Sequence, residues 1–172
     1  MNKKIASFAP GACVKNGVFL ALLLKFKMDD QSDFLTAWPL PLTTKFFQEI
    51  LEFEGYLRTT NEVFDSDLAS VELKRLSPII SKSESENTPA TSVVQEFSTY
   101  IVNNELHITI VRAKQTAPDL VILKAHHAEW LMGFIGATLA EFDQDSALFE
   151  QTGAQHCGYR EIERLPIRHE KI

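Results

Sequence analysis

The first long apolar segment, residues 18–27 (VFLALLLKFK), is apolar on both of its alternating faces for most of its length. This pattern is typical of a central strand that is covered on both sides of its sheet. Residues 28–33 (MDDQSD) have the composition of a turn, and residues 34–38 (FLTAW) have the pattern of a second strand. Together these segments predict an antiparallel hairpin that ends before Pro39.

A second hairpin is predicted in the later half of the chain. Apolar and polar residues alternate in residues 97–102 and again in residues 106–110. Asn103 and Asn104 lie between them, and asparagine tolerates the positive φ that a two-residue turn requires. Residues 119–123 (DLVIL) have the pattern of a further strand. A helix over residues 125–142 is predicted from the spacing of Trp130, Phe134, Ala137 and Glu141.

The segment from residue 43 to residue 76 has the spacing of a helix, and Thr43 or Thr44 is suited to cap it. Its apolar stripe consists of Phe46, Ile50, Phe53, Leu57, Phe64, Leu68 and Val71. A continuous helix would be about 50 Å long, whereas a domain of this size is about 40 Å across. The helix would then extend beyond its own domain, and the apolar stripe there would need another helix to cover it, most simply from a second copy of the chain. Alternatively, the helix breaks at residues 58–62 (RTTNE), which gives two antiparallel helices sharing one core.

These segments predict one α+β domain, with an antiparallel sheet built from two strand–strand–helix units and the long or broken helix (about 43–76) between them. Unit one spans residues 5–76 and unit two spans residues 94–145. Residues 77–93 are rich in Ser, Glu, Thr and Pro, which indicates a solvated linker or flexible loop. Residues 146–172 form a C-terminal tail. The helical apolar pairs 46–47 and 50–51 recur 84 positions later, which is weak evidence of an internal duplication.

The composition fits a soluble globular chain, since 45% of its 172 residues are apolar and 23% are charged. No apolar run reaches the roughly 18 residues of a membrane span, and the first residues lack the apolar core of a secretory signal. Cys13 and Cys157 are therefore expected to be free thiols in the cytoplasm. The net charge of −6 disfavours broad contact with nucleic acid. That role would need Lys25, Lys27 and the tail arginines Arg160, Arg164 and Arg168 to gather on one face.

Two adjacent histidines, His126 and His127, lie between the last predicted strand and the last helix. Neighbouring helical residues point about 100° apart, so this pair cannot bind one metal ion from a regular helix. We interpret them as the junction where a strand meets a helix. Cys157 beside His156 is a further candidate for catalysis, but sequence neighbours rarely have the geometry of a nucleophile and its base. No motif predicts a metal, a nucleotide or any other cofactor.

The sequence therefore favours a non-catalytic protein-interaction module, such as an adaptor, regulator, inhibitor or immunity-type factor. The expected partner is another protein, with a homodimer through the 43–76 helix as one form. The candidate binding residues are Trp38, Trp130, Phe64 and Leu68. The first alternative is a small hydrolase or transferase that uses His126 or His127 with carboxylates. The second is a protein associated with nucleic acid.

Overall fold

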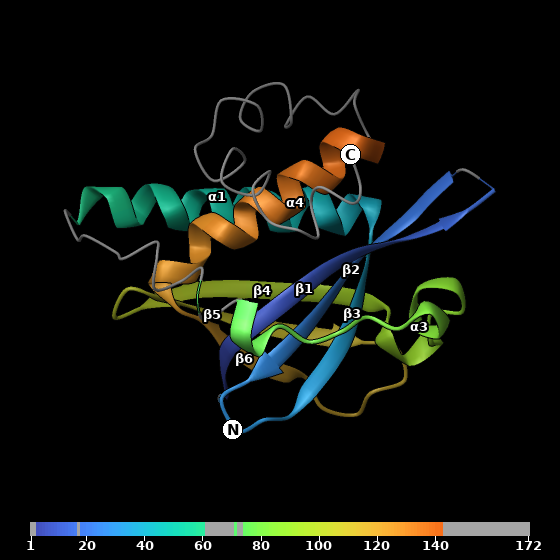
Figure 1. Ribbon diagram of the computed structural model, residues 1–172. Helices are drawn as coiled ribbons and strands as arrows, with labels where there is room; N and C mark the ends of the chain where they lie inside the picture. Colours follow the sequence, from blue (N-terminus) through green and yellow to red (C-terminus); the bar gives the residue numbers. More distant parts are fainter. Residues whose placement is uncertain (1–2, 17, 61–70, 72–73, 143–172) are drawn as a thin grey trace.

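The computed structural model describes residues 3–16, 18–60, 71 and 74–142. These residues form one sheet and the helices that cover it (Figure 1). The strands are β1 (Lys3–Lys15), β2 (Val18–Met28), β3 (Asp33–Pro39), β4 (Val94–Val102), β5 (Glu105–Arg112) and β6 (Asp119–Leu123). The helices are α1 (Leu40–Thr59), α3 (Lys82–Glu86) and α4 (Ala128–Phe142), with short 3₁₀ turns η1 (Ala90–Ser92) and η2 (Ala125–His127).

The strands are arranged in the order β3-β2-β1-β6-β5-β4. All neighbouring strands pair antiparallel except β1 and β6, which pair parallel over Lys3 and Lys4. The two outer strands also approach each other, because Ala37 in β3 forms an isolated parallel bridge to Val93 just before β4. The sheet therefore curls until its two edges meet at one point. The predicted α+β fold with a mostly antiparallel sheet is confirmed, and the parallel junction is an addition to it.

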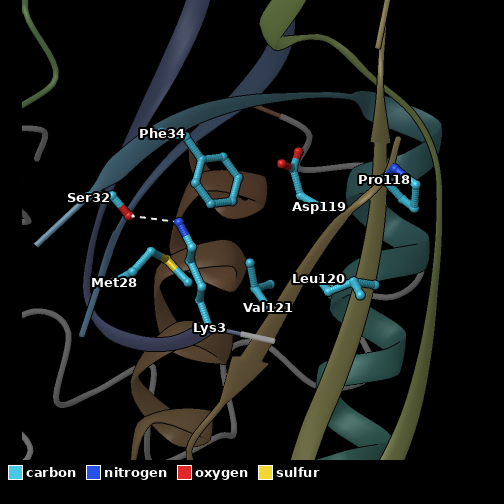
Figure 2. Close-up of a pocket in the computed structure, with 8 residues that line it drawn as sticks. All are labelled: Lys3, Met28, Ser32, Phe34, Pro118, Asp119, Leu120 and Val121. Carbon is cyan, nitrogen blue, oxygen red and sulfur yellow. Dashed lines mark hydrogen bonds between the residues drawn. The ribbon is translucent and has the colours of Figure 1, made fainter. Parts of the chain in front are cut away.

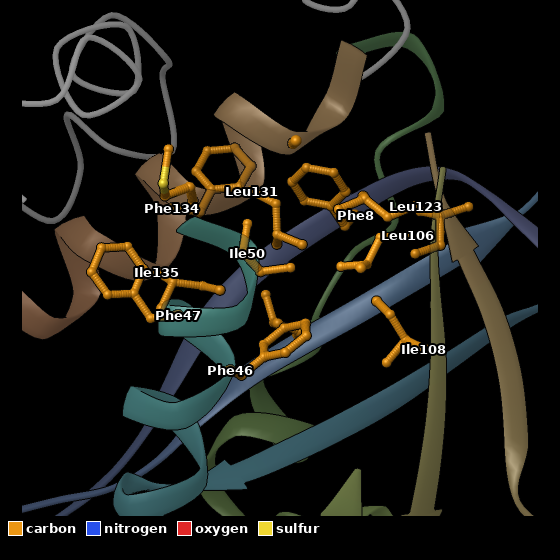
Figure 3. Packing of buried hydrophobic residues seen from close by; sticks show 14 of the residues in the cluster. Phe8, Phe46, Phe47, Ile50, Leu106, Ile108, Leu123, Leu131, Phe134 and Ile135 are labelled. Carbon is orange, nitrogen blue, oxygen red and sulfur yellow. The ribbon is translucent and has the colours of Figure 1, made fainter. Parts of the chain in front are cut away.

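The main core lies between one face of the sheet and the helices α1 and α4, which pack side by side above it (Figures 1 and 3). The alternation of apolar residues in the strands produces this core. In β5, for example, the alternate residues Leu106, Ile108 and Ile110 are buried against the helices. Asn103 and Asn104 have φ of 51° and 62°, so the predicted two-residue turn before β5 is confirmed.

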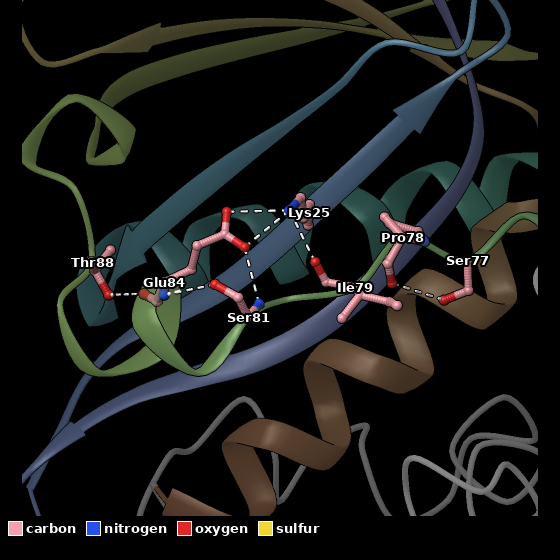
Figure 4. Close-up of polar contacts among 7 residues, drawn as sticks. All are labelled: Lys25, Ser77, Pro78, Ile79, Ser81, Glu84 and Thr88. Atoms are coloured by element: carbon pink, nitrogen blue, oxygen red, sulfur yellow. Dashed lines mark hydrogen bonds and ion pairs between the residues drawn. The ribbon is translucent and has the colours of Figure 1, made fainter.

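The opposite face of β2 is covered by residues 78–93, which we call the strap. Ile80 and Val93 of the strap pack on a second cluster formed by Cys13, Leu23, Leu35 and Ala37. Helix α3 in the strap begins with a capping box, in which the Ser81 hydroxyl and the Glu84 side chain each accept a hydrogen bond from the other residue's backbone N–H. Lys25 of β2 donates to Glu84 Oε1 at 2.9 Å and to the Ile79 carbonyl at 2.9 Å (Figure 4). The sequence predicted a solvated linker or flexible loop here; the segment contains the short helix α3, which the S-K-S-E capping signal indicates.

Helix α1 differs at both ends from the predicted helix. It begins at Leu40, with Pro39 as its N-cap, and Thr43 lies inside it with its hydroxyl bonded to the Trp38 carbonyl at 2.8 Å. The predicted Thr43 or Thr44 cap is therefore wrong. The helix ends at Thr59 and its C-cap is Thr60, so the predicted break is confirmed and one continuous helix to residue 76 is not formed. Twenty residues span about 30 Å, so α1 has no overhang that needs a second chain.

The two units repeat the same register, and each has three strands: those of unit two were all predicted, whereas unit one has the additional strand β1. Strand β1 was missed because Pro10 and Gly11 are poor strand formers. Leu24 of β2 pairs with Thr36 of β3, and Ile108 of β5 pairs with Val121 of β6. The second pair lies 84 and 85 positions after the first. The helices begin 88 positions apart, at Leu40 and Ala128, because η2 adds a turn in unit two.

Candidate functional site

A pocket of about 250 Å³ opens where β2 ends and where β1, β3 and β6 begin. We call it the mouth pocket (Figure 2). Both units contribute to it, because β1 pairs with β6 there and the curled sheet brings the start of β3 opposite. Its lining consists of Lys3, Met28, Ser32, Phe34, Pro118, Asp119, Leu120 and Val121.

One wall of the mouth pocket is a fixed ion pair. Arg112 Nε donates to Asp119 Oδ2 at 2.8 Å, and its Nη1 donates to the Leu35 carbonyl at 3.3 Å. The guanidinium also lies over the Phe34 ring, with Cζ 5.0 Å from the ring centroid. Arg112 thus joins the end of β5 to β6 and to β3, and its side chain is only 17% exposed. Since its polar contacts are met within the protein, this arginine closes the wall and has little freedom to reach a ligand.

The opposite rim carries a looser ion pair. Lys3 Nζ lies 3.0 Å from Asp30 Oδ2, and these side chains are 42% and 50% exposed. Ser32 donates to Asp30 from its hydroxyl and from its backbone N–H, the latter at 2.9 Å. These two hydrogen bonds, followed by the interaction with Lys3, lower the pKa of Asp30 from 3.8 to about 2.

A second concave site of about 200 Å³ lies between α1 and the end of the β4–β5 hairpin. We call it the hairpin groove, and its lining consists of Glu49, Glu52, Phe53, Thr99, Tyr100, Ile101 and Leu106. The Thr99 hydroxyl donates to Glu49 Oε2 at 3.2 Å, which links the strand to the helix. Tyr100, Ile101 and Val102 are consecutive and are 54%, 39% and 38% exposed. The groove therefore joins an apolar strand end to two carboxylate-bearing residues.

The histidines belong to neither lining and lie in η2, at the start of α4. His127 is fully buried, with its ring edge-on to Phe8 at 6.1 Å between centroids. Its backbone N–H donates to the Lys124 carbonyl at 3.0 Å, as expected for a residue in a tight turn. The His126 ring is half-buried, 4.3 Å from that of His127. The histidine pair thus occupies the junction between β6 and α4, and Cys157 and His156 lie outside the described residues.

The aromatic candidates are parts of the core. Trp38 is fully buried, stacks on Phe46 with ring centroids 4.2 Å apart, and donates from Nε1 to the Thr36 hydroxyl at 2.7 Å. Trp130 is 6% exposed and belongs to the same core cluster. Neither residue offers a binding surface in this conformation, and Trp38 packs helix α1 against the sheet. Phe64 and Leu68 lie outside the described residues.

Within the described part of the chain, no group of three or more His, Cys, Asp or Glu residues is arranged to hold a metal ion. The carboxyl groups of Asp30 and Glu84 both have a lowered pKa. For Glu84 the first cause is its hydrogen bond from the Ser81 backbone. A lowered pKa keeps a carboxylate ionised at neutral pH, which is unsuitable for a proton donor.

Sequence reasoning identified neither site. The residues of the mouth pocket come from positions 3, 28–34 and 118–121, which become neighbours only through the parallel β1–β6 pairing. One local signal was available, because Asp30 and Ser32 in DDQSD have the spacing of an aspartate-capped turn. The alternating pattern predicted the apolar end of β4 as a strand. It did not predict that this strand end is exposed, because the exposure depends on the position of β4 at the edge of the sheet.

Comparison with models of known protein families gives no match, and comparisons with curated proteins and with solved structures give none either. Among the helices described, none is both long and apolar enough to cross a membrane. Function is therefore inferred from the geometry of this chain alone.

Proposed function

We propose that this protein acts without catalysis, by binding an extended, basic segment of another protein in the hairpin groove. The observation that carries the proposal is the run Tyr100–Ile101–Val102. These three consecutive apolar residues are exposed at the end of an outer strand. A partner strand that adds to such an edge gains backbone hydrogen bonds, and its alternate side chains enter the adjoining groove.

The end of β4 lacks the features by which proteins protect an exposed strand edge. Such edges are usually interrupted by charges, prolines or bulges. The beginning of β4 has these features, since a register shift lies between Val94 and Glu96 and Glu96 itself is exposed. The residues 100–102 carry neither a charge nor a proline. This contrast favours a strand end that is kept open for a partner.

The charge of the groove selects the kind of partner. Glu49 and Glu52 belong to its lining, and the whole chain has a net charge of −6. A segment that alternates apolar residues with Lys or Arg complements both features. A second copy of this chain fits less well, because pairing two β4 edges about a twofold axis brings both glutamate pairs together. The homodimer through the 43–76 helix also loses its basis, since α1 ends at Thr59.

The test is a selection of random peptides displayed on phage against the purified full chain, followed by fluorescence anisotropy with the enriched peptides. We expect enriched sequences in which apolar residues alternate with Lys or Arg. Ile101→Asp should weaken their binding at least about tenfold, as for a central interface residue. Glu52→Gln should weaken binding less and should reduce its dependence on salt concentration.

The matched control is Val18→Asp, which places the same charge on another exposed apolar strand residue, 58% exposed in the β1–β2 hairpin. This variant should bind as the unchanged protein does. Enriched peptides without basic residues would contradict the charge argument. Equal effects of Ile101→Asp and Val18→Asp, with both variants folded by circular dichroism, would refute the groove as the binding site.

A further inference from the structure

The mouth pocket combines an apolar interior with one cation that can change partners. Met28, Phe34 and Val121 line it and belong to the main core or pack against it. The polar groups at its edge are Lys3, Ser32 and Asp119 (Figure 2). Arg112, beside the pocket, is fixed by Asp119, a backbone carbonyl and an aromatic ring. Lys3 is the one whose surroundings leave it movable.

The Lys3–Asp30 pair is weak as an ion pair in water. Both side chains are about half exposed, and solvent screening leaves an exposed pair with little net stability. The contact from Lys3 Nζ to Ser32 Oγ is long, at 3.5 Å. Another anion can therefore take the place of Asp30 at the Lys3 ammonium at little cost.

Asp30 does not depend on Lys3 for its hydrogen bonds. Its Oδ1 accepts from the Ser32 hydroxyl and from the Ser32 backbone N–H. These two contacts are the largest causes of its lowered pKa, ahead of Lys3. When Lys3 turns toward a ligand, Asp30 stays solvated and hydrogen-bonded. The negative charge of Asp119 is likewise neutralised by Arg112, so it does not repel an anion strongly.

We propose that the mouth pocket binds a small monocarboxylate with a compact apolar body, with the carboxylate on Lys3 Nζ and the body against Phe34, Met28 and Val121. A volume of about 250 Å³ holds roughly eight non-hydrogen atoms, at about the 30 Å³ that a water molecule occupies in the liquid. Benzoate and hexanoate are of this size. The site is separate from the hairpin groove, so the proposal does not rest on the partner-binding function.

The test is a titration of the full chain with benzoate and with hexanoate, followed by backbone amide chemical shifts in NMR spectra. Benzyl alcohol and hexanol serve as uncharged probes of the same shape. We expect saturable shifts at residues 3, 32–34 and 119–121, with the carboxylates binding at least about tenfold more tightly than the alcohols. Lys3→Met should remove this preference, Lys3→Arg should restore it, and Asp30→Asn should leave binding unchanged or tighter.

The control is Lys4→Met. Lys4 is the next residue in β1, is 48% exposed and is also paired with a carboxylate, that of Glu105, but it does not line the pocket. Its substitution should leave carboxylate binding unchanged. The proposal is overturned if millimolar carboxylate causes no saturable shifts at these residues. It is also overturned if the alcohols bind equally well, or if Lys3→Met and Lys4→Met have the same effect.

Discussion

At the scale of single residues, the ion pairs of this protein differ in what holds them. Arg112 is 17% exposed and contacts a carboxylate, a backbone carbonyl and an aromatic ring. Lys3 is 42% exposed and shares Asp30 with Ser32. The first arrangement stabilises the junction of the two units, whereas the second leaves a cation available at the surface. Burial and the number of contacts, rather than the distance between charges, separate these roles.

The pKa of Asp30 tests this distinction. A carboxyl group whose pKa falls from 3.8 to about 2 on folding adds stability that is present above pH 4 and is lost as the pH falls from about 4 to about 2. We expect Ser32→Ala to raise the pKa of Asp30 more than Lys3→Met does, because the Ser32 hydroxyl is the largest cause of the shift. The measurement is an NMR titration of the Asp30 carboxyl carbon. A larger effect of Lys3→Met would show that Lys3 is held firmly, contrary to our inference.

At the scale of elements, the strap explains how a strand apolar on both faces is accommodated. The helices cover one face of β2 and the strap covers Leu23 on the other. Gly11 of β1 permits this close cover, since a Cβ atom there would lie 3.0 Å from Ile80 Cδ1. The pairing of Lys25 with Glu84, at side-chain exposures of 15% and 25%, holds α3 in place. Opening of the strap would uncover the second cluster, including Cys13.

The reactivity of Cys13 measures that opening. Cys13 is 7% exposed in the cluster on which the strap packs. In a Cys157→Ser background, Glu84→Gln should speed the labelling of Cys13 by a thiol reagent about tenfold, the factor that corresponds to a loss of about 1.4 kcal/mol. Lys82→Met, which alters the exposed pair with Glu86 on the same helix, should leave the rate unchanged. Equal rates in the two variants would mean that the Lys25–Glu84 pair does not hold the strap.

The predictable elements are those whose signal is local. The β2–β3 and β4–β5 hairpins and the helix ending at Phe142 follow from alternation, turn residues and helical spacing. Strand β1 was not predicted, because Pro10 and Gly11 mask a strand that is stabilised by its pairing with β2. The mouth pocket was not predictable, because it requires knowing that Lys3 lies beside Val121. Long-range pairing determines the site, whereas local pattern determines most of its elements.

At the scale of the whole molecule, each unit completes the core of the other. Phe8 in β1 of unit one packs edge-on against Phe134 in α4 of unit two, with centroids 5.3 Å apart. Phe97 in β4 of unit two packs edge-on against Phe46 in α1 of unit one, at 5.4 Å. Both contacts have an interplanar angle of 82°. The first strand of each unit is thus covered by the helix of the other unit, so the two units are not independent bodies.

Because each unit's first strand packs under the helix of the other unit, we predict a single unfolding transition for the chain. Each unit contains one of the two tryptophans, which reports on that unit. Trp38 ends β3 of unit one and Trp130 lies in α4 of unit two. In urea, Trp38→Phe reports the fluorescence of Trp130 alone, and Trp130→Phe reports that of Trp38 alone. In each variant, the unfolding midpoint from fluorescence should equal the midpoint from circular dichroism. Phe8→Ala should lower the free energy of unfolding by about 3–5 kcal/mol. It should shift both tryptophan signals together, although Phe8 belongs to unit one alone. If the Trp38 signal shifted while the Trp130 signal kept its midpoint, the units would fold separately, and the mouth pocket between them would open without loss of either core.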